Sequence, residues 1–500
     1  MDIFSGLLSG FQVIFQPVNF LYCFLGVFVG TLIGVLPGIG PVGAMSILLP
    51  TTFGVSPIAG VVMLAGIYYG AMYGGSTTSI LVNIPGEAAS VITCLDGYQM
   101  ARKGRAGPAL GMAALGSFIG GTFSIIALMF LAYPLSEAAV KFGPPEYFSL
   151  MCMGLVVVTY LARGSLSKAL VMAILGLILG VVGTDPISGK LRFTLGFPDL
   201  ADGIDLVPLA MGLFGISEVL TNIEKPIKRM IFQTKIQHLL PTREDWKNSV
   251  GPIVRGSFTG FFLGILPGGG SILSSFVSYS MEKKISKHPE KFGTGIIEGI
   301  AGPETANNAA TGGAFVPLLA LGIPPNIVMA LLFGALLVHG VYPGPMLIKQ
   351  HPEIFWGTIA SMYVGNAMLL VLNLPLIGLW VKLLKVPYRI LFPLILLFTL
   401  IGSYTINNKT FDVLVMICFG LVGYILRKFQ YEEAPLILAF ILGPILEQAF
   451  RQSLIMSNGS LAIFVSRPIA FVALALSAAL LASTVIGIFR QARKRVAEIE

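Results

Sequence analysis

The chain contains the stretch Gly30-Thr-Leu-Ile-Gly-Val-Leu-Pro-Gly-Ile-Gly-Pro41, and 230 residues later it contains the related stretch Gly260-Phe-Phe-Leu-Gly-Ile-Leu-Pro-Gly-Gly-Gly-Ser271. The two copies share a central Leu-Pro-Gly and three further glycines. Proline removes a backbone donor and glycine permits positive φ, so each copy predicts a break at the end of an apolar helix. Apolar segments broken at matching places in two halves are typical of transporter binding sites. The pair therefore predicts an internal repeat.

The composition indicates a membrane protein. Of the 500 residues, 55% are hydrophobic and only 11% are charged, whereas a soluble domain carries about 25% charged residues. Apolar runs of about 20 residues recur and predict an all-α polytopic protein with roughly 11–13 membrane segments. The net charge of +8 lies in short loops between apolar runs. The positive-inside rule explains this charge, so we expect a lipid bilayer and no nucleic acid as partner.

The chain divides into two halves and a linker. We expect a first half over 1–221, a basic cytoplasmic linker over 222–250, a second half over 251–489 and a cytoplasmic tail over 490–500. Apolar runs predict membrane segments at 18–36, 57–82, 108–133, 146–162, 167–183, 204–221, 251–280, 326–341, 355–381, 389–403, 411–426, 434–455 and 461–489. Residues 1–16 and 41–49 are apolar but too short to span, so we expect an interfacial helix and a re-entrant segment.

The charges of two corresponding loops indicate whether the two halves are parallel or inverted in the membrane. The loop 282–291, after the second Pro-Gly motif, is strongly basic, whereas its counterpart 50–57 carries no charge. Parallel repeats would put both loops on one side of the membrane. The difference predicts repeats inverted about the membrane plane, with broken helices or re-entrant hairpins.

The helix breaks provide candidate binding groups. A helix that starts after a break aims its N-terminal N–H groups at the space in front of it, which suits an anion. Two such tips facing each other would hold the carboxylates of one substrate; the alternative is a packing kink without a ligand. The backbone contacts predicted for this site are those of Gly38, Gly40, Gly268, Gly269 and Gly270, with the side chain of Ser271.

Consecutive hydroxyl residues stand in an apolar segment of the first half. The segment reads Tyr69-Gly-Ala-Met-Tyr-Gly-Gly-Ser-Thr-Thr-Ser79 and continues to Asn83-Ile-Pro-Gly-Glu87. Such groups coordinate Na⁺ or bond a carboxylate, and they equally serve helix packing. For the functional interpretation we assign Ser76, Thr77 and Asn83 to substrate and Thr78 to a cation.

The second half carries a corresponding polar stripe in Ile297–Gly313. Polar groups spaced three and four apart share a helix face, and in a membrane segment they indicate a functional site. Asn307 and Asn308 are assigned to substrate, and Glu304 and Thr311 to a cation. Glu304 also follows Gly-Pro and so fits a cap in the first turn of a helix.

Four stretches resemble those of a known family: 34–40, 69–79, 83–87 and Gly302-Pro-Glu-Thr-Ala-Asn-Asn-Ala-Ala310. Over about residues 18–450 the chain resembles the large membrane subunit of the bacterial tripartite tricarboxylate transporters (TctA-like). The resemblance implies a multi-pass protein of the bacterial inner membrane, beside a small membrane subunit and a periplasmic substrate-binding protein. It implies uptake of a citrate-like or other organic carboxylate driven by a cation gradient, with Na⁺ or H⁺ as coupling ion and no covalently bound cofactor.

Three classes of function can be compared. The repeat and the polar stripes favour secondary active uptake of an organic carboxylate. The alternative is a passive organic-anion channel, which would give flux without concentration and without dependence on a cation gradient. An enzyme is not expected, because no hydrolase, zinc-protease or phosphate-binding motif occurs. The four cysteines, Cys23, Cys94, Cys152 and Cys418, are scattered and suggest neither a metal site nor a disulfide framework.

Overall fold

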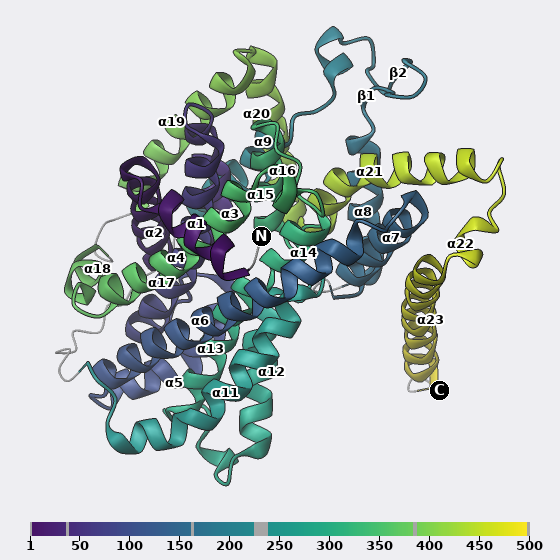
Figure 1. Ribbon diagram of the computed structural model, residues 1–500. Helices are drawn as coiled ribbons and strands as arrows, with labels where there is room; N and C mark the ends of the chain where they lie inside the picture. The colour runs from purple at the N-terminus through teal and green to yellow at the C-terminus, as the bar shows by residue number, and fades with distance from the viewer. Residues whose placement is uncertain (1–2, 37–39, 162–164, 225–238, 384–387, 498–500) are drawn as a thin grey trace. The chain divides into compact units, whose positions relative to one another are not determined.

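The computed structural model describes residues 3–36, 40–161, 165–224, 239–383 and 388–497, which are mostly helical (Figure 1). The chain forms two compact units: the first contains Met1–Glu137 and Asp205–Tyr424, and the second contains Ala138–Ile204 and Ile425–Glu500. In the described residues, eight helices are long and apolar enough to cross a membrane, and five shorter apolar helices accompany them. The protein is therefore a helical, multi-pass membrane protein, as its composition predicts.

The first unit contains α1–α6 and α9–α20. Their bounds are α1 Ile3–Ile14, α2 Pro17–Val35, α3 Gly40–Leu48, η1 Leu49–Thr52, α4 Pro57–Val82, η2 Ala88–Ser90, α5 Val91–Arg102, α6 Ala106–Ala139, α9 Leu206–Ala210, η4 Met211–Ile216, α10 Ser217–Glu224, α11 Arg243–Ile265, α12 Gly270–Ile285, η5 Pro289–Lys291, α13 Glu298–Gly313, α14 Phe315–Leu321, α15 Ile327–Val338, α16 Leu347–Gln350, α17 Pro352–Asn373, α18 Ile377–Leu383, α19 Tyr388–Asn407 and α20 Thr410–Lys428.

The helix that ends at the first Pro-Gly motif, α2, packs closely along α4 (Figure 1). Three glycines of α2 lie directly on carbonyl oxygens of α4. A Cβ added to each would lie within 2.5 Å of one of them: Gly26 at Met63, Gly30 at Ile67 and Gly34 at Ala71. Only glycine permits two helix backbones to approach this closely. The glycines before the first motif therefore set the contact between α2 and α4.

The helix that ends at the second motif, α11, packs on α13 in the same way. Its glycines meet carbonyl oxygens at 2.1–2.6 Å from an added Cβ: Gly256 at Gly302, Gly260 at Ala306 and Gly264 at Ala310. The contacted residues lie 239 positions after their counterparts on α4, and the glycines lie 230 positions after theirs. The α2–α4 pair and the α11–α13 pair therefore make equivalent contacts between glycines and carbonyl oxygens.

The ends of the paired helices also correspond. The segment predicted as a broken Ser/Thr-rich helix is a continuous α4 that stops at Asn83, which caps it with φ 58°. Gly322, 239 positions later, caps α14 with φ 71°. Both caps adopt the left-handed conformation that ends many helices. An Ile-Pro dipeptide follows each cap, so the chain leaves both helices in the same manner.

The two short apolar segments of the first half are helical. Residues 3–14 form α1, whose Gly6 and Gly10 press against Trp356 of α17. The stretch predicted as re-entrant forms α3 and η1, which together extend from Gly40 to Thr52. Nine residues of α-helix cover about half of a bilayer core.

The second unit contains α7 Pro144–Leu161, α8 Leu166–Gly180, β1 Gly183–Thr184, β2 Leu191–Arg192, η3 Pro198–Asp202, α21 Ala434–Met456, α22 Ile463–Ser466 and α23 Pro468–Ala497. Its core lies where α7, α8 and α21 meet, around Met151, Leu155, Ala173, Ala439 and Leu442. Strands β1 and β2 pair antiparallel, with Gly183 opposite Arg192. This hairpin lies in the stretch of the chain between α8 and α9.

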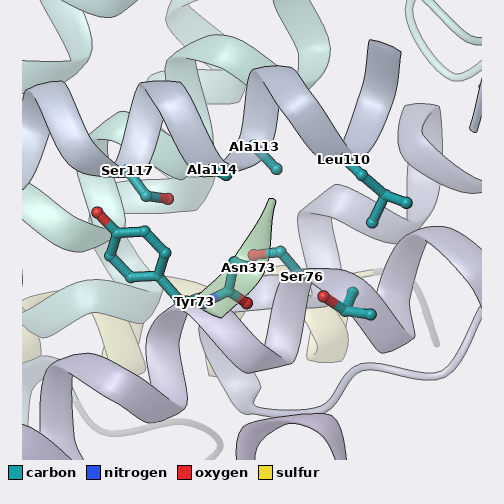
Figure 2. A pocket seen from close by; sticks show the side chains of 8 residues that line it. Tyr73, Ser76, Leu110, Ala113, Ala114, Ser117 and Asn373 are labelled. Carbon is teal, nitrogen blue, oxygen red and sulfur yellow. The ribbon is translucent and has the colours of Figure 1, made fainter. Parts of the chain in front are cut away.

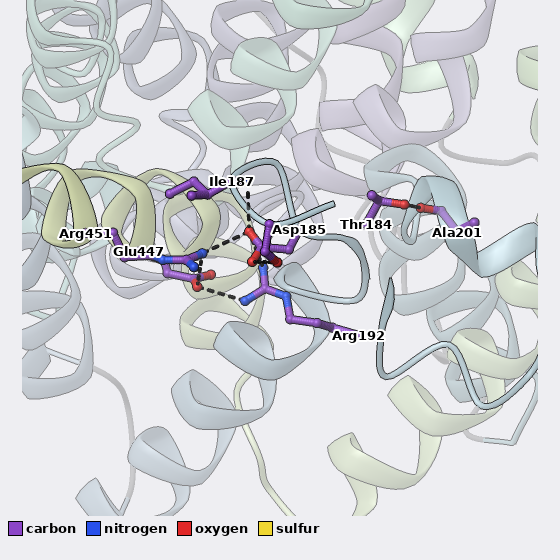
Figure 3. Close-up of polar contacts among 8 residues, drawn as sticks. Thr184, Asp185, Ile187, Arg192, Ala201, Glu447 and Arg451 are labelled. Carbon is purple, nitrogen blue, oxygen red and sulfur yellow. Dashed lines mark hydrogen bonds and ion pairs between the residues drawn. The ribbon is translucent and has the colours of Figure 1, made fainter. Parts of the chain in front are cut away.

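Ion pairs join the β1–β2 hairpin to α21. Figure 3 shows Glu447 and Arg451 of α21 facing Asp185 and Arg192. Arg451 Nη1 lies 2.9 Å from Asp185 Oδ1, and Arg192 Nη1 lies 2.8 Å from Glu447 Oε1. Hydrogen bonds from the Ser188 hydroxyl and Arg451, with the backbone N–H of Ile187, hold the pKa of the Asp185 carboxyl well below its usual range. The contribution of Asp185 to stability is therefore complete above the ordinary carboxyl pKa, and it is lost as pH falls toward the lower folded value.

Replacing Arg451 with Ala should loosen the hairpin. The substitution removes one of the donors to Asp185 and a 3.3 Å contact to Glu447, so we expect backbone amides of residues 183–192 to exchange with deuterium several-fold faster at pH 7. Arg467→Ala is the matched control, because Arg467 pairs instead with Glu146. Unchanged exchange in Arg451→Ala would show that the network does not hold the hairpin.

Candidate functional site

A carboxylate lies at the centre of the first unit. Glu304 is 0% exposed and projects from α13. Its oxygens accept hydrogen bonds from Ser76 Oγ at 2.6 Å, from Thr93 Oγ1, from Asn307 Nδ2 at 3.3 Å and from Ser117 Oγ at 3.5 Å. The donors belong to α4, α5, α13 and α6. One side chain of α13 thus joins that helix to α4, α5 and α6, whose donors lie 187–228 positions earlier in the chain.

The asparagine pair extends this cluster. Asn308 Nδ2 donates to Ser117 Oγ at 2.8 Å and to the Asn307 side-chain oxygen. Both amides are almost fully buried. Because Asn307 also donates to Glu304, two residues predicted to bind substrate lie in one hydrogen-bonded network with the residue predicted to bind a cation.

A cavity adjoins the network between α4 and α6. Figure 2 shows Tyr73 and Ser76 of α4 and Ser117 of α6 around this space, together with Asn373 of α17. Thr77 lines it too. Ser76 and Thr77, both predicted as substrate-binding, therefore line this cavity.

A second convergence point is the hydroxyl of Tyr68. It interacts with the side chains of Thr311 and Ser271 and accepts a hydrogen bond from Asn326 Nδ2 at 3.4 Å. It also lies within electrostatic range of Glu87. Tyr68 thus brings together α4, the start of α12 after the second break, α13, the start of α15 and the loop after Asn83.

The helices that begin after the two breaks, α3 and α12, start with the same backbone conformation. Gly40 begins α3 with φ 64° and Gly270 begins α12 with φ 54°, and at both an added Cβ would meet no atom of the described residues within 4 Å. Gly268 donates its N–H to the carbonyl of Pro325 at 2.9 Å. Gly269 lies close to the backbone, with its would-be Cβ 2.1 Å from the oxygen of Leu263. Gly38 lies outside the described residues.

Three predicted site residues make other contacts. Thr78 Oγ1 donates to the carbonyl of Val35 at 2.7 Å, and Thr311 Oγ1 donates to that of Asn307 at 2.9 Å. Among the described residues, no hydrogen bond joins either of them to Glu304. Asn83 is exposed at the end of α4. The structure therefore brings Ser76, Asn307, Asn308 and Glu304 together and places Thr311 and Ser271 at Tyr68.

Tyr68, Thr93 and Ser117 are not among the site residues that the sequence predicts. Tyr68 immediately precedes the quoted Tyr69 motif, so its neighbourhood was a signal that could have identified it. Thr93 and Ser117 carry no such signal, because each is a lone hydroxyl in an apolar or mixed segment. Their partner Glu304 lies 211 and 187 positions away.

Apolar helices that enclose a buried polar network, with two helices that start directly after Leu-Pro-Gly breaks, define a multi-pass membrane protein of the transporter type. The chain belongs to the tripartite tricarboxylate transporter TctA family, whose model matches residues 20–438. This is a transporter family and not an enzyme family, and its members are components of tripartite tricarboxylate transporters.

Two curated proteins of Agrobacterium vitis resemble the chain. One, described as an uncharacterized 52.8 kDa protein in the TAR-I ttuC' 3' region, is 51% identical over 99% of both chains. The other, described as an uncharacterized protein in the TAR-II ttuC' 3' region, is 56% identical over 42% of this chain and 87% of its own length. No solved structure matches.

Proposed function

We propose that the protein is the large membrane subunit of a binding-protein-dependent transporter that takes up a tricarboxylate or related organic carboxylate with a cation, Na⁺ or H⁺. In this proposal it lies in the bacterial inner membrane beside a small membrane subunit. A periplasmic substrate-binding protein delivers the carboxylate. The observation that carries the proposal is the convergence of both halves at Tyr68, in a chain of the TctA family.

The proposed architecture is a pair of inverted repeats. The matched contacts of α2 on α4 and of α11 on α13 support the repeat, as do the matched caps at Asn83 and Gly322. Their inversion is supported by the uncharged loop 50–57 against the basic loop 282–291.

The proposed carboxylate site lies at the two helix starts. Gly40 and Gly270 begin α3 and α12 with positive φ, and the N-terminal N–H groups of both helices are favourable partners for anions. Ser271 follows Gly270 directly and interacts with Tyr68. A bound cation near the site would offset the repulsion between the substrate and the buried Glu304.

The test is uptake of labelled carboxylates by proteoliposomes that contain all three subunits, under an imposed Na⁺ gradient and with matched no-gradient controls. Accumulation above equilibrium that collapses without the gradient is the expected result. A proton gradient in place of Na⁺ identifies H⁺ as the coupling ion. Flux that only reaches equilibrium and ignores both gradients would overturn the proposal and indicate a passive anion channel.

Tyr68→Phe should weaken carboxylate uptake. The change deletes a hydroxyl that interacts with Thr311, Ser271 and Asn326 and that, in this proposal, donates to the bound carboxylate. Losing a hydrogen bond to a charged group costs about 1.5–3 kcal/mol. We therefore expect KM for the carboxylate to rise roughly tenfold or more with the protein still folded. Tyr69→Phe is the control, because the Tyr69 hydroxyl donates to the backbone of Ser361. Equal effects of the two substitutions would remove Tyr68 from the site.

A further inference from the structure

We propose that a sodium ion binds at Glu304, with the side-chain oxygens of Ser76, Thr93 and Ser117 as its other ligands. This inference rests on the proposed function, because it gives the coupling ion a place and a set of ligands. The site lies where α4, α5, α6 and α13 meet.

The first argument is charge. A fully buried carboxylate is costly unless a cation compensates it. Across the described ranges, no Lys, Arg or His side chain is paired with Glu304, and the titratable groups that face it are Tyr73 and Cys94. Neither of these side chains carries a positive charge. The protein surrounds Glu304 with dipoles but supplies no cation of its own.

The second argument is the chemistry of the ligands. Carboxylate, hydroxyl and amide oxygens are the ligands that hard cations prefer. A serine or threonine hydroxyl that donates to a carboxylate also has two lone pairs, so it turns its oxygen to a cation by rotating its hydrogen away. For Ser76 a second acceptor is already at hand, because its Oγ lies 3.4 Å from the carbonyl oxygen of Met72.

The third argument is that two of the ligands are reached from the cavity, and that the cavity is lined by a residue with an unpaired oxygen. Ser76 and Ser117 contact Glu304 and also line the cavity of Figure 2, so an ion in the cavity would meet two of the ligands. Asn373 lines the same cavity and is 4% exposed. Its Oδ1 has no hydrogen-bond partner among the described residues. A buried carbonyl oxygen without a donor is suited to a cation that has lost part of its hydration shell.

The donors around Glu304 lower the cost of keeping its carboxylate ionised. Every side chain in contact with the Glu304 oxygens donates a hydrogen bond, and donors stabilise the ionised form of a carboxyl group. Thr78 and Thr311, which sequence reasoning assigned to the cation, are left out of the site, because both hydroxyls donate to backbone carbonyls.

The test measures sodium binding directly on the purified full-length chain. The thermal unfolding midpoint is followed against NaCl, with choline chloride keeping ionic strength constant. We expect Na⁺ to raise the midpoint of the wild type, because a ligand of the native state stabilises it. Glu304→Gln should raise the half-saturating Na⁺ concentration roughly tenfold or more, and Ser117→Ala should raise it by a smaller factor. Glu298→Gln, a carboxylate change on the same helix outside the cluster, should leave it unchanged.

Two results would overturn the inference: a wild-type midpoint indifferent to Na⁺, or the same half-saturation in Glu304→Gln and Ser117→Ala as in the wild type. If Glu304→Gln does not fold, Ser117→Ala and Thr93→Val decide. Uptake by the three-subunit complex separates this inference from the proposed function. Na⁺-driven uptake that keeps its Na⁺ dependence in these variants would remove the site and leave the transporter proposal standing, whereas wild-type uptake independent of any cation would overturn both.

Discussion

Replacing Asp96 with Ala is expected to destabilise the first unit strongly. Asp96 is 0% exposed on α5. Its Oδ1 accepts from the backbone N–H groups of Gly293, Gly295 and Ile296 at 3.0, 2.7 and 3.0 Å, and its Oδ2 accepts from the Tyr279 hydroxyl at 2.9 Å. Each buried donor left without an acceptor costs about 1–3 kcal/mol. The total is a large fraction of the roughly 5–15 kcal/mol that keeps a domain folded.

The measurement is the thermal unfolding midpoint and the yield of monodisperse protein in detergent. Asp96→Asn should fall between the wild type and Asp96→Ala, because its amide keeps one acceptor oxygen. Asp199→Ala, at an exposed aspartate of η3, should behave like the wild type. If Asp96→Ala unfolds at the wild-type midpoint, the loop before α13 does not depend on this carboxylate.

Asp96 is also an example of a contact that the sequence alone does not predict. From sequence it is a single acidic residue near a basic loop, which suggests a carboxylate at the membrane interface. Its donors lie 183–200 positions later in the chain, and no periodicity links them to it. The same holds for Thr93 and Ser117 at Glu304. Contacts between distant segments depend on how helices pack, and one sequence does not specify that packing.

The helix ends that the sequence predicts correctly depend on the chemistry of neighbouring residues. The Leu-Pro-Gly motif at 36–38 and its copy at 266–268 mark real ends: α2 stops at Val35 and α11 stops at Ile265. The Ser/Thr run lies inside α4, which continues through it without a break. Ser79 donates to the carbonyl of Gly75 one turn back, so the hydroxyl is satisfied along the helix and does not interrupt it. The chain turns only at Asn83, before Ile84-Pro85, where proline disfavours a further helical residue.

The glycines before the two motifs lead to the other large expected effect. An added Cβ at Gly260 would lie 2.1 Å from the carbonyl oxygen of Ala306 and 2.7 Å from its Cα. The obstacle is backbone, not a flexible side chain, so α11 and α13 must separate to accommodate a methyl group. Overpacking a tight contact costs about 1–3 kcal/mol, occasionally more. We expect Gly260→Ala to lower the unfolding midpoint markedly, and Gly30→Ala, with its added Cβ 2.5 Å from the oxygen of Ile67, to do the same in the first half.

The matched control is Gly378→Ala, for which we expect the unfolding midpoint to rise slightly instead of falling. Gly378 is exposed in α18 and an added Cβ there would meet nothing within 4 Å, so Gly378→Ala exchanges a poor helix former for a good one. Inside a helix that exchange is worth about 0.5–1 kcal/mol in favour of alanine. Destabilisation at Gly30 and Gly260 with none at Gly378 would show that close backbone contact, rather than helix propensity, requires glycine before each motif. A wild-type midpoint for Gly260→Ala would mean that α11 and α13 do not touch at this position, and the matched contacts that support the repeat would lose one of their pairs.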